Sequence, residues 1–224
     1  GDRLPSERDL SDQMGISRPI LREALKELQE RGILHSERGG GTYVADIIGE
    51  VFSPQMTDLF SRHMKAKADY LAYRREVDAL SAQWACARAT ADDQEILTRL
   101  MSKMEAAAQG SDVEYEAKLD VDFHNFICEC AHNIVLMHTQ RACYKLLAAG
   151  VFFSRDMIYS QTGTSEMLLR QHRAIYDGIV ARDRKEAVAA THAHLDFIEL
   201  KTRQWEESQG REVVSALRKQ RAAD

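Results

Sequence analysis

Apolar residues recur at helical spacing along almost the whole chain, and strand-like alternation is absent beyond residue 53. The first run follows Ser6-Glu-Arg-Asp9, where the serine oxygen can accept a backbone N–H and the acidic groups favour the positive end of a helix. It stops at Gly15, because glycine adopts the left-handed conformation after a helix most easily. A second helix is expected to begin after Ser17, with Pro19 in its first turn, and to end at Gly32. Its helical stripe consists of Ile20, Leu21, Ala24, Leu25 and Leu28.

The next segment predicts two short strands joined by the turn Arg38-Gly39-Gly40-Gly41. Helix, tight turn, helix and hairpin together form the plan of a winged helix-turn-helix domain over residues 1–45. The second helix of this plan enters the major groove of DNA by its N-terminus. There Arg18 and Arg22 share one face, and Ser17 offers a hydroxyl to a phosphate. The arginine and glycines of the turn would form a wing tip that can approach the minor groove or a phosphate closely.

The charge balance restricts what this segment can bind. The formal net charge of the 224 residues is −5 at pH 7, which argues against non-specific coating of nucleic acid by the whole molecule. Residues 1–44 carry nearly equal numbers of acidic and basic side chains, so a DNA site must be a local patch. Isolated arginines on helices are usually solvated surface groups, but the joint position of three arginines at one helix start and one wing favours DNA contact.

Beyond residue 45 the pattern predicts only helices, so the fold class is mostly α. We expect a linker and connecting helix over residues 46–66, a bundle of six or seven helices over 67–209, and a polar, frayed tail over 210–224. Helix starts of capping-box form occur at Thr90, Ser111 and Asp183. The expected helices span about 54–65, 67–89, 91–108, 112–131, 134–159, 165–181 and 184–208.

Four polar side chains of the helical region carry candidate chemistry. Asp120 and His124 are four residues apart, so they lie on one helical face and can chelate one ion. His172 and His194 lie on otherwise apolar stripes, each eleven residues from Asp183, where a turn is expected. An antiparallel helix pair would place both imidazoles at one level, about 16 Å from the turn. A single inward histidine is more often a hydrogen-bonded core residue, but this set favours a divalent metal, Zn²⁺, Ni²⁺ or Mn²⁺, with room for water or a ligand oxygen.

Composition indicates the compartment. No segment approaches the roughly 18 apolar residues of a membrane span, and no signal peptide opens the chain. The cysteines lack zinc-ribbon spacing and are expected to be reduced and partly buried. We therefore expect a cytoplasmic protein.

The segment LPSERDLSDQMGISRPILREALKELQERGILHSERGGGTYV resembles the DNA-binding domain of GntR-superfamily transcription regulators, FadR subgroup. The shared pattern is LP-x-ER-x-L, then S-R-x-x-LREAL-x-x-L-x-x-x-G, then GGGT-x-V. In the family this domain begins with a further helix, which would lie upstream of Gly1. By this resemblance the DNA-contacting residues are Arg8, Ser17, Arg18, Arg22, Arg38 and Gly39.

Residues 67–205 resemble the FadR C-terminal (FCD) effector domain, a bundle of six or seven helices. Its metal-binding members carry an Asp-x-x-x-His pair, a histidine about 48 residues later and another about 22 residues beyond. These positions fall on Asp120, His124, His172 and His194. The resemblance implies a small carboxylate effector whose oxygens complete the coordination. The family's R-x-x-x-E pair falls on Arg74 and Asp78, so Arg74 is expected to pair with the effector, beside a carboxylate shorter than the family's glutamate.

These features together predict a homodimeric, ligand-responsive regulator that binds palindromic double-stranded operator DNA and acts as a repressor. An open site of three histidines and one aspartate also fits a metal-dependent hydrolase, the principal alternative. No HExxH or GxSxG motif accompanies the four ligands, and a winged helix has no role in such an enzyme, so we expect no enzymatic activity. A third interpretation is a helical interaction module that binds neither metal nor DNA.

Overall fold

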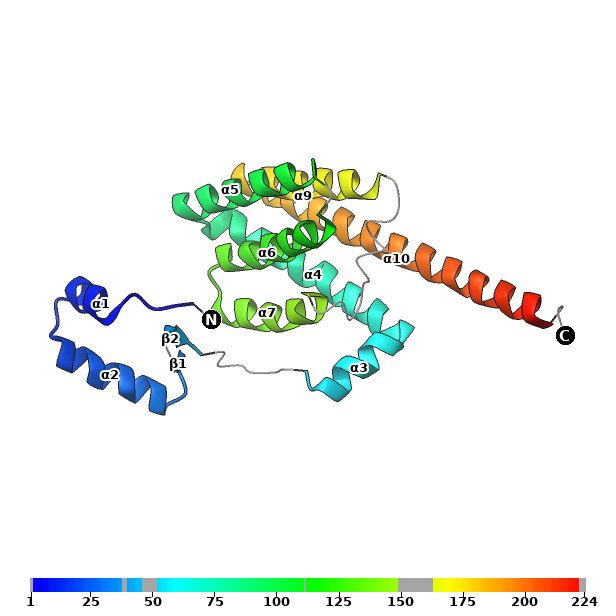
Figure 1. Ribbon diagram of the computed structural model, residues 1–224. Coiled ribbons are helices and arrows are strands. Elements are labelled where there is room, and N and C mark those ends of the chain that lie inside the picture. Colours follow the sequence, from blue (N-terminus) through cyan, green and yellow to red (C-terminus); the bar gives the residue numbers. More distant parts are fainter. Residues whose placement is uncertain (1, 38–39, 46–51, 111, 149–162, 222–224) are drawn as a thin grey trace. The chain divides into compact units, whose positions relative to one another are not determined.

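The computed structural model describes residues 2–37, 40–45, 52–110, 112–148 and 163–221. The chain divides into two compact units, Gly1–Val51 and Phe52–Asp224. In the described residues the first unit holds two helices and a two-stranded sheet, and the second unit holds only helices (Figure 1). The predicted fold class is therefore confirmed.

The first unit follows the local signals of its sequence. Its elements are α1 (Glu7–Met14), α2 (Arg18–Glu30), β1 (Leu34–Glu37) and β2 (Gly41–Val44). The Ser6 side chain accepts a hydrogen bond from the Asp9 backbone N–H at 3.2 Å, and α1 ends at Gly15 with a φ of 65°. Leu21 is buried, whereas Ile20, which shares its predicted stripe, is 59% exposed.

Ser17 occupies the N-cap position of α2, but its side chain makes no capping hydrogen bond. An N-cap side chain normally accepts from the second or third helical residue. The second residue here is Pro19, which has no N–H to donate. Ser17 thus stands at the expected N-cap position, but its hydroxyl makes no hydrogen bond to the backbone of α2.

The hairpin pairs β1 with β2 in antiparallel register, from Leu34 opposite Val44 to Glu37 opposite Gly41. The N-terminal residues extend the sheet through a bridge between Arg3 and Tyr43. Gly41 has a φ of 112°, and a Cβ there would lie 2.8 Å from the Arg3 side chain. The hairpin therefore needs glycine at this position. The predicted wing-tip residues Arg38 and Gly39 lie outside the described residues.

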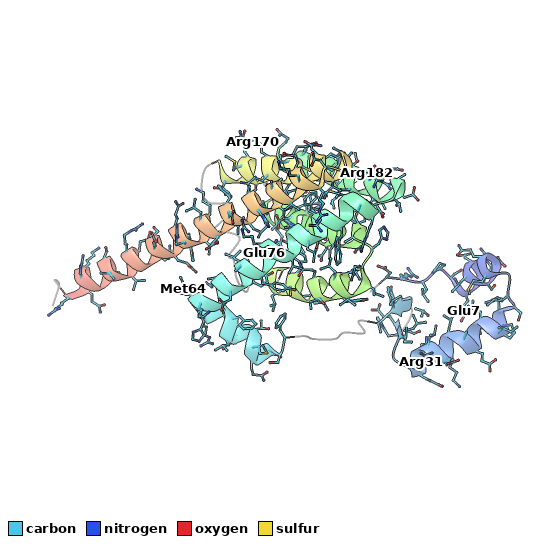
Figure 2. All side chains as sticks on the ribbon, turned by 180° about the vertical axis from the view of Figure 1, so that it is seen from behind. Glu7, Arg31, Met64, Glu76, Arg170 and Arg182 are labelled. Carbon is cyan, nitrogen blue, oxygen red and sulfur yellow. The ribbon has the colours of Figure 1, made fainter. Side chains whose placement is uncertain are left out.

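The second unit is built around α4. Its elements are α3 (Pro54–Arg62), α4 (Met64–Arg88), α5 (Ala91–Ala107), α6 (Val113–Cys130), α7 (Ile134–Ala148), α9 (Thr164–Val180) and α10 (Arg184–Arg221). α4 packs against α6, α9 and α10, and α5 packs against α6 and α9. Small buried residues of α4, Ala82 and Ala85, let neighbouring helices approach a core that includes Phe123 and Ile175. Figure 2 shows side chains filling the space between these helices.

Several predicted boundaries need correction. α4 begins at Met64 instead of residue 67, directly after α3. α6 is capped by Asp112, whose side chain accepts from the Tyr115 N–H at 2.9 Å, rather than by the predicted Ser111, which is not described. Asp112 is an equally good capping residue, which explains the shift. The predicted helix 134–159 is described only to Ala148.

The predicted frayed tail is wrong for most of its length, because α10 continues to Arg221. Residues 209–221 contain no proline and several strong helix formers. Their last turn is basic, which suits the negative end of a helix. The last turns of α10 extend away from the other helices of this unit (Figure 2). No described helix has the length and apolar character needed to cross a membrane.

The turn between α9 and α10 sets the register of these two helices. A Cβ on Gly178 would lie 2.7 Å from the Ala187 backbone nitrogen, so only glycine permits this close packing. Arg182 takes a positive φ of 56°, and the Asp183 side chain accepts from the N–H groups of Lys185 and Glu186. Arg182 is marked at this turn in Figure 2. The turn therefore falls where the sequence predicted it, midway between His172 and His194.

Candidate metal centre and nucleic-acid interface

Three helices bring the four predicted metal ligands together. α6 supplies Asp120 and His124, α9 supplies His172, and α10 supplies His194. The Nε2 atom of His172 lies 3.3 Å from Nε2 of His124 and 3.0 Å from Oδ1 of Asp120. The ring centroid of His194 lies 4.6 Å from that of His172 and 5.2 Å from that of His124. All three imidazoles are buried, and one nitrogen of each lies within 4.8 Å of the other ligand atoms.

This donor set fits a divalent transition metal. Each residue offers one ligand atom, and the four atoms lie within 4.8 Å of one another. Bonds of roughly 2.1 Å allow ligand atoms to be at most about 4.2 Å apart, so only small side-chain adjustments are needed. Three imidazoles and one carboxylate suit Zn²⁺, Ni²⁺ or Mn²⁺, and an ion with five or six ligands would have a position left for a further oxygen.

The protonation states of the site also favour metal binding, because a ligand must be deprotonated to coordinate. Burial lowers the pKa of His124 to about 4, with Asp120 opposing this shift. Burial, reinforced by His172, lowers the pKa of His194 well below its ordinary value. For Asp120 burial raises the pKa, but the hydrogen bond with His172 and the nearby imidazoles outweigh it and hold the pKa below its ordinary value. The imidazoles of His124 and His194 are therefore neutral at pH 7, and the carboxylate of Asp120 is ionised.

Two side chains outside the four ligands contact them, and neither contact was predicted from the sequence. The Nδ1–H of His194 donates to Oε1 of Gln171 at 3.1 Å, which leaves Nε2 for a metal. On the opposite side, Nδ1 of His124 lies 3.8 Å from Oδ2 of Asp78. Gln171 is separated from His194 by 23 positions in the sequence, so only the packing of α9 on α10 reveals this pair.

Arg74 lies in a buried network beside the site. Its Nε and Nη2 atoms donate to Oδ2 of Asp78 at 3.2 and 3.0 Å. The other Asp78 oxygen accepts from Gln140 at 2.8 Å and from the Tyr144 hydroxyl at 2.6 Å. The Tyr144 ring in turn stacks on His124. Arg74 is thus held one layer behind the metal ligands by Asp78, the residue that departs from the family's glutamate.

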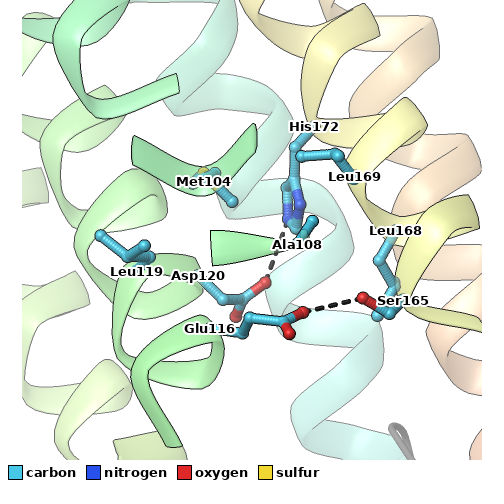
Figure 3. Close-up of a pocket in the computed structure, with 9 residues that line it drawn as sticks. All are labelled: Met104, Ala108, Glu116, Leu119, Asp120, Ser165, Leu168, Leu169 and His172. Carbon is cyan, nitrogen blue, oxygen red and sulfur yellow. Dashed lines mark hydrogen bonds and ion pairs between the residues drawn. The ribbon is translucent and has the colours of Figure 1, made fainter. Parts of the chain in front are cut away.

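A pocket opens onto one side of the ligand cluster (Figure 3). Its volume of about 20 Å³ is room for one water molecule. Of the four ligands, Asp120 and His172 line it, together with side chains from α5, α6 and α9. Asp120 is the ligand with appreciable exposure, at 24% of its side chain. The pocket is therefore a route from solvent to the cluster.

In the first unit, the predicted DNA-contacting side chains of α1 and α2 face solvent. Arg18 and Arg22 are 53% and 61% exposed, and both approach Oε2 of Glu7, at 3.8 and 2.7 Å. Arg8 is also exposed, on α1. Glu7 therefore joins α1 to α2 and holds the two arginines on one side of the second helix. Ser17, directly before Arg18, is exposed as well.

Family models match both units. The model described as "Bacterial regulatory proteins, gntR family" matches residues 1–44, and the model described as "FCD domain" matches residues 69–197. The second match covers more than half of the chain and includes all four candidate metal ligands.

Similar proteins and structures agree with these matches. The chain is 36% identical to the putative L-lactate dehydrogenase operon regulatory protein of Escherichia coli K12, over 94% of this chain and 82% of that protein. It is 33% identical to the Glc operon transcriptional activator of the same strain, over 87% of this chain and 78% of that protein.

Solved structures share the fold. A GntR protein of Streptococcus agalactiae has a TM-score of 0.56 at 23% identity, over 88% of this chain and 89% of that one. A GntR family member from Pseudomonas syringae pv. tomato also has a TM-score of 0.56, at 20% identity, over 95% and 80% of the two chains. Because both relatives with more than 30% identity are named as operon regulators, the comparisons do not support the hydrolase alternative. The chain belongs to the GntR family of bacterial transcription regulators, as a DNA-binding protein with an FCD effector domain.

Proposed function

We propose that this protein is a metal-dependent sensor of a small organic acid that represses transcription as a cytoplasmic homodimer on palindromic operator DNA. Asp120, His124, His172 and His194 would hold the metal, and the acid would reach it through the adjoining pocket. When bound, the metal would supply a Lewis-acid position for a carboxylate oxygen. The convergence of four ligand atoms within 4.8 Å, from three helices, is the observation that carries this proposal.

The DNA-reading part of the proposal rests on the start of α2. Arg18 and Arg22 stand on one side of the first two turns of α2, where a recognition helix meets base edges and phosphates. The Ser17 hydroxyl makes no capping bond and can donate to a phosphate. We assign Arg8, Arg38 and Gly39 to the same interface. A two-fold operator would match the symmetry of a homodimer.

The sensing part rests on the surroundings of the ligands. The pocket beside Asp120 and His172 has room for one water molecule, so an acid larger than this must displace side chains of α5, α6 or α9 as it binds. A ligand that fits one arrangement of these helices better than another shifts the balance between them by that difference in affinity. Because the Arg74 guanidinium already donates to Asp78, Arg74 could bind the acid only by dividing its hydrogen bonds between the acid and Asp78. The ligand therefore acts through helix packing.

Operator binding tests the proposal directly. We expect a small monocarboxylate to weaken operator binding of the metal-loaded protein by about 1–3 kcal/mol, the usual size of allosteric coupling. L-lactate is the first acid to titrate, because one relative is named for an L-lactate dehydrogenase operon. Fluorescence anisotropy with an inverted-repeat operator measures the change. The matched control is metal-stripped protein, which should bind the operator without responding to the acid.

The outcomes separate the parts of the proposal. An unchanged operator affinity across small carboxylates, with metal bound, would refute the sensor. Tighter operator binding in the presence of the acid would keep the sensor but make the acid a corepressor. Equal response with and without metal would remove the four-ligand centre from the mechanism.

A further inference from the structure

The four ligands are not equally accessible, and this asymmetry defines a path to them. The three histidines are at most 3% exposed, whereas the Asp120 side chain is 24% exposed. A second pocket reaches His124 from the side of Asp78 and Tyr144, but it leaves no room for a water molecule. Of the two pockets described at the cluster, the one beside Asp120 and His172 is thus the way in.

The charged residues of this entry pocket are both acidic. Asp120 belongs to the ligand set, and Glu116 lies one turn earlier on the same face of α6. The remaining described lining is apolar apart from Ser165 and His172, and it contains no lysine or arginine. Two carboxylates in a partly buried pocket create a negative potential that attracts a cation, and a bound divalent cation would offset this potential for an incoming acid.

Glu116 also spans the pocket. Its Oε2 atom accepts a hydrogen bond from the Ser165 hydroxyl at 2.8 Å, which joins α6 to the first turn of α9. Figure 3 shows this contact together with the Asp120–His172 contact. A carboxylate has several acceptor positions, and a serine hydroxyl rotates freely, so Glu116 can take a second partner without a backbone movement.

We propose that Glu116 is the entry ligand of the metal centre. It would take a divalent cation from solvent at the pocket mouth and pass it one helical turn inward to Asp120 and the three histidines. Ser165 would hold Glu116 across the mouth before the cation arrives. This proposal rests on the metal centre of the proposed function, and it adds a residue outside the four ligands that controls how fast the centre fills.

The rate of metal uptake tests this role. Apo protein is mixed with Co²⁺ in a stopped-flow instrument, and the visible absorption of coordinated cobalt reports binding. Glu116→Gln should slow the second-order uptake by about threefold to tenfold, because an attracting charge is lost from the mouth. The final amount of bound cobalt should be unchanged. The difference between the variant and the wild type should shrink as salt rises, because salt screens the attraction.

Three further variants keep the test specific. Glu116→Asp retains the charge and should restore most of the rate, which separates an electrostatic role from a structural one. Ser165→Ala frees Glu116 and should leave uptake as fast as in the wild type or faster. Glu166→Gln is the matched control, because Glu166 lies next to Ser165 on α9, is paired with Arg170 and does not line the pocket. It should leave the rate unchanged.

Uptake by Glu116→Gln at the wild-type rate would overturn the proposal and leave the proposed function intact. Equal slowing by Glu166→Gln would overturn it too, because any nearby acidic group would then have the same effect. Failure of the wild-type protein to bind cobalt or another divalent ion would instead remove the metal centre itself.

Discussion

The two units of this protein place their functional side chains in opposite surroundings. In the first unit, Arg18 and Arg22 are more than half exposed and lie beside Glu7, whose side chain is also partly exposed. In the second unit, His124, His172 and His194 are buried within a helical core. An exposed arginine depends little on packing, and its effect on DNA is set by position and charge. A buried ligand depends on three helices keeping one register, so its site is coupled to the stability of the whole unit.

Removing a metal ligand should have the largest effect. His172→Ala removes the ligand whose Nε2 atom lies near both His124 and Asp120. We expect loss of metal binding and of the stabilisation that metal confers, about 4 kcal/mol when metal is present at a thousand times its Kd. Elemental analysis and thermal unfolding with and without metal measure both. His192→Ala, on the neighbouring helix α10 and outside the cluster, is the control. Full metal occupancy in the His172 variant would contradict the four-ligand centre.

Disturbing the register of α9 and α10 should affect the same site from a distance. Gly178→Ala would place a methyl group 2.7 Å from the Ala187 backbone, so the two helices must separate. Overpacking of this kind costs about 1–3 kcal/mol, and metal affinity should fall together with the free energy of unfolding. Gly210→Ala provides a control, because nothing lies within 4 Å of the added Cβ. A stable Gly178 variant with normal metal affinity would show that the register is not critical.

Substitution of an exposed arginine of α2 should weaken DNA binding without affecting the fold. Arg22→Ala should weaken operator binding by about 1–3 kcal/mol if the side chain reads a base, with little change in thermal stability. Lys26→Ala removes a cation one turn later on α2 and should have a smaller effect. Electrophoretic mobility shifts at several salt concentrations distinguish base contact from phosphate contact. Unchanged affinity and salt dependence would exclude Arg22 from the interface.

The smallest expected effect concerns the start of α5. Thr90 and Asp93 form a reciprocal capping box, and Thr90→Ala should destabilise the second unit by about 1 kcal/mol at pH 7. Burial raises the pKa of Asp93, but hydrogen bonds from Thr90 and His132 outweigh it and lower the pKa below 3.8. A lowered pKa stabilises the fold above that value, and the stabilisation is lost as the pH falls below it.

The difference between the wild type and Thr90→Ala should therefore narrow below about pH 4. Urea unfolding at pH 7 and near pH 3 measures it. A constant difference across this range would show that the Asp93 carboxylate does not contribute through the cap.

Local signals in the sequence were sufficient for much of this organisation. Gly15 ends α1, Thr90 caps α5, and the spacing about Asp183 places His172 and His194 opposite one another. These features depend on a few neighbouring residues or on the fixed rise of a helix. The gathering of Asp120 and His124 with the two later histidines required a tertiary contact of α6, which the turn at Asp183 does not supply and which the family resemblance implied.

Other features could not be predicted, because they depend on which helix faces which. Gln171 contacts His194, Glu116 contacts Ser165, and Tyr144 contacts Asp78 only through the packing of α4, α6, α7, α9 and α10. The missing capping bond of Ser17 follows from its proline neighbour. The continuation of α10 follows from helix-forming residues, whose polar character had predicted a frayed tail. Apolar periodicity identifies a buried face but not its partner.

The uninterrupted course of α10 has a mechanical consequence. His194 lies in its packed half, and the helix runs on to Arg221, a distance of about 40 Å at 1.5 Å per residue. A tilt of only about 5° at the histidine would carry the far end sideways by about 3.5 Å over that length. The helix thus acts as a lever arm, in which an adjustment too small to disturb the core at one end becomes a displacement as large as an atom's diameter at the other.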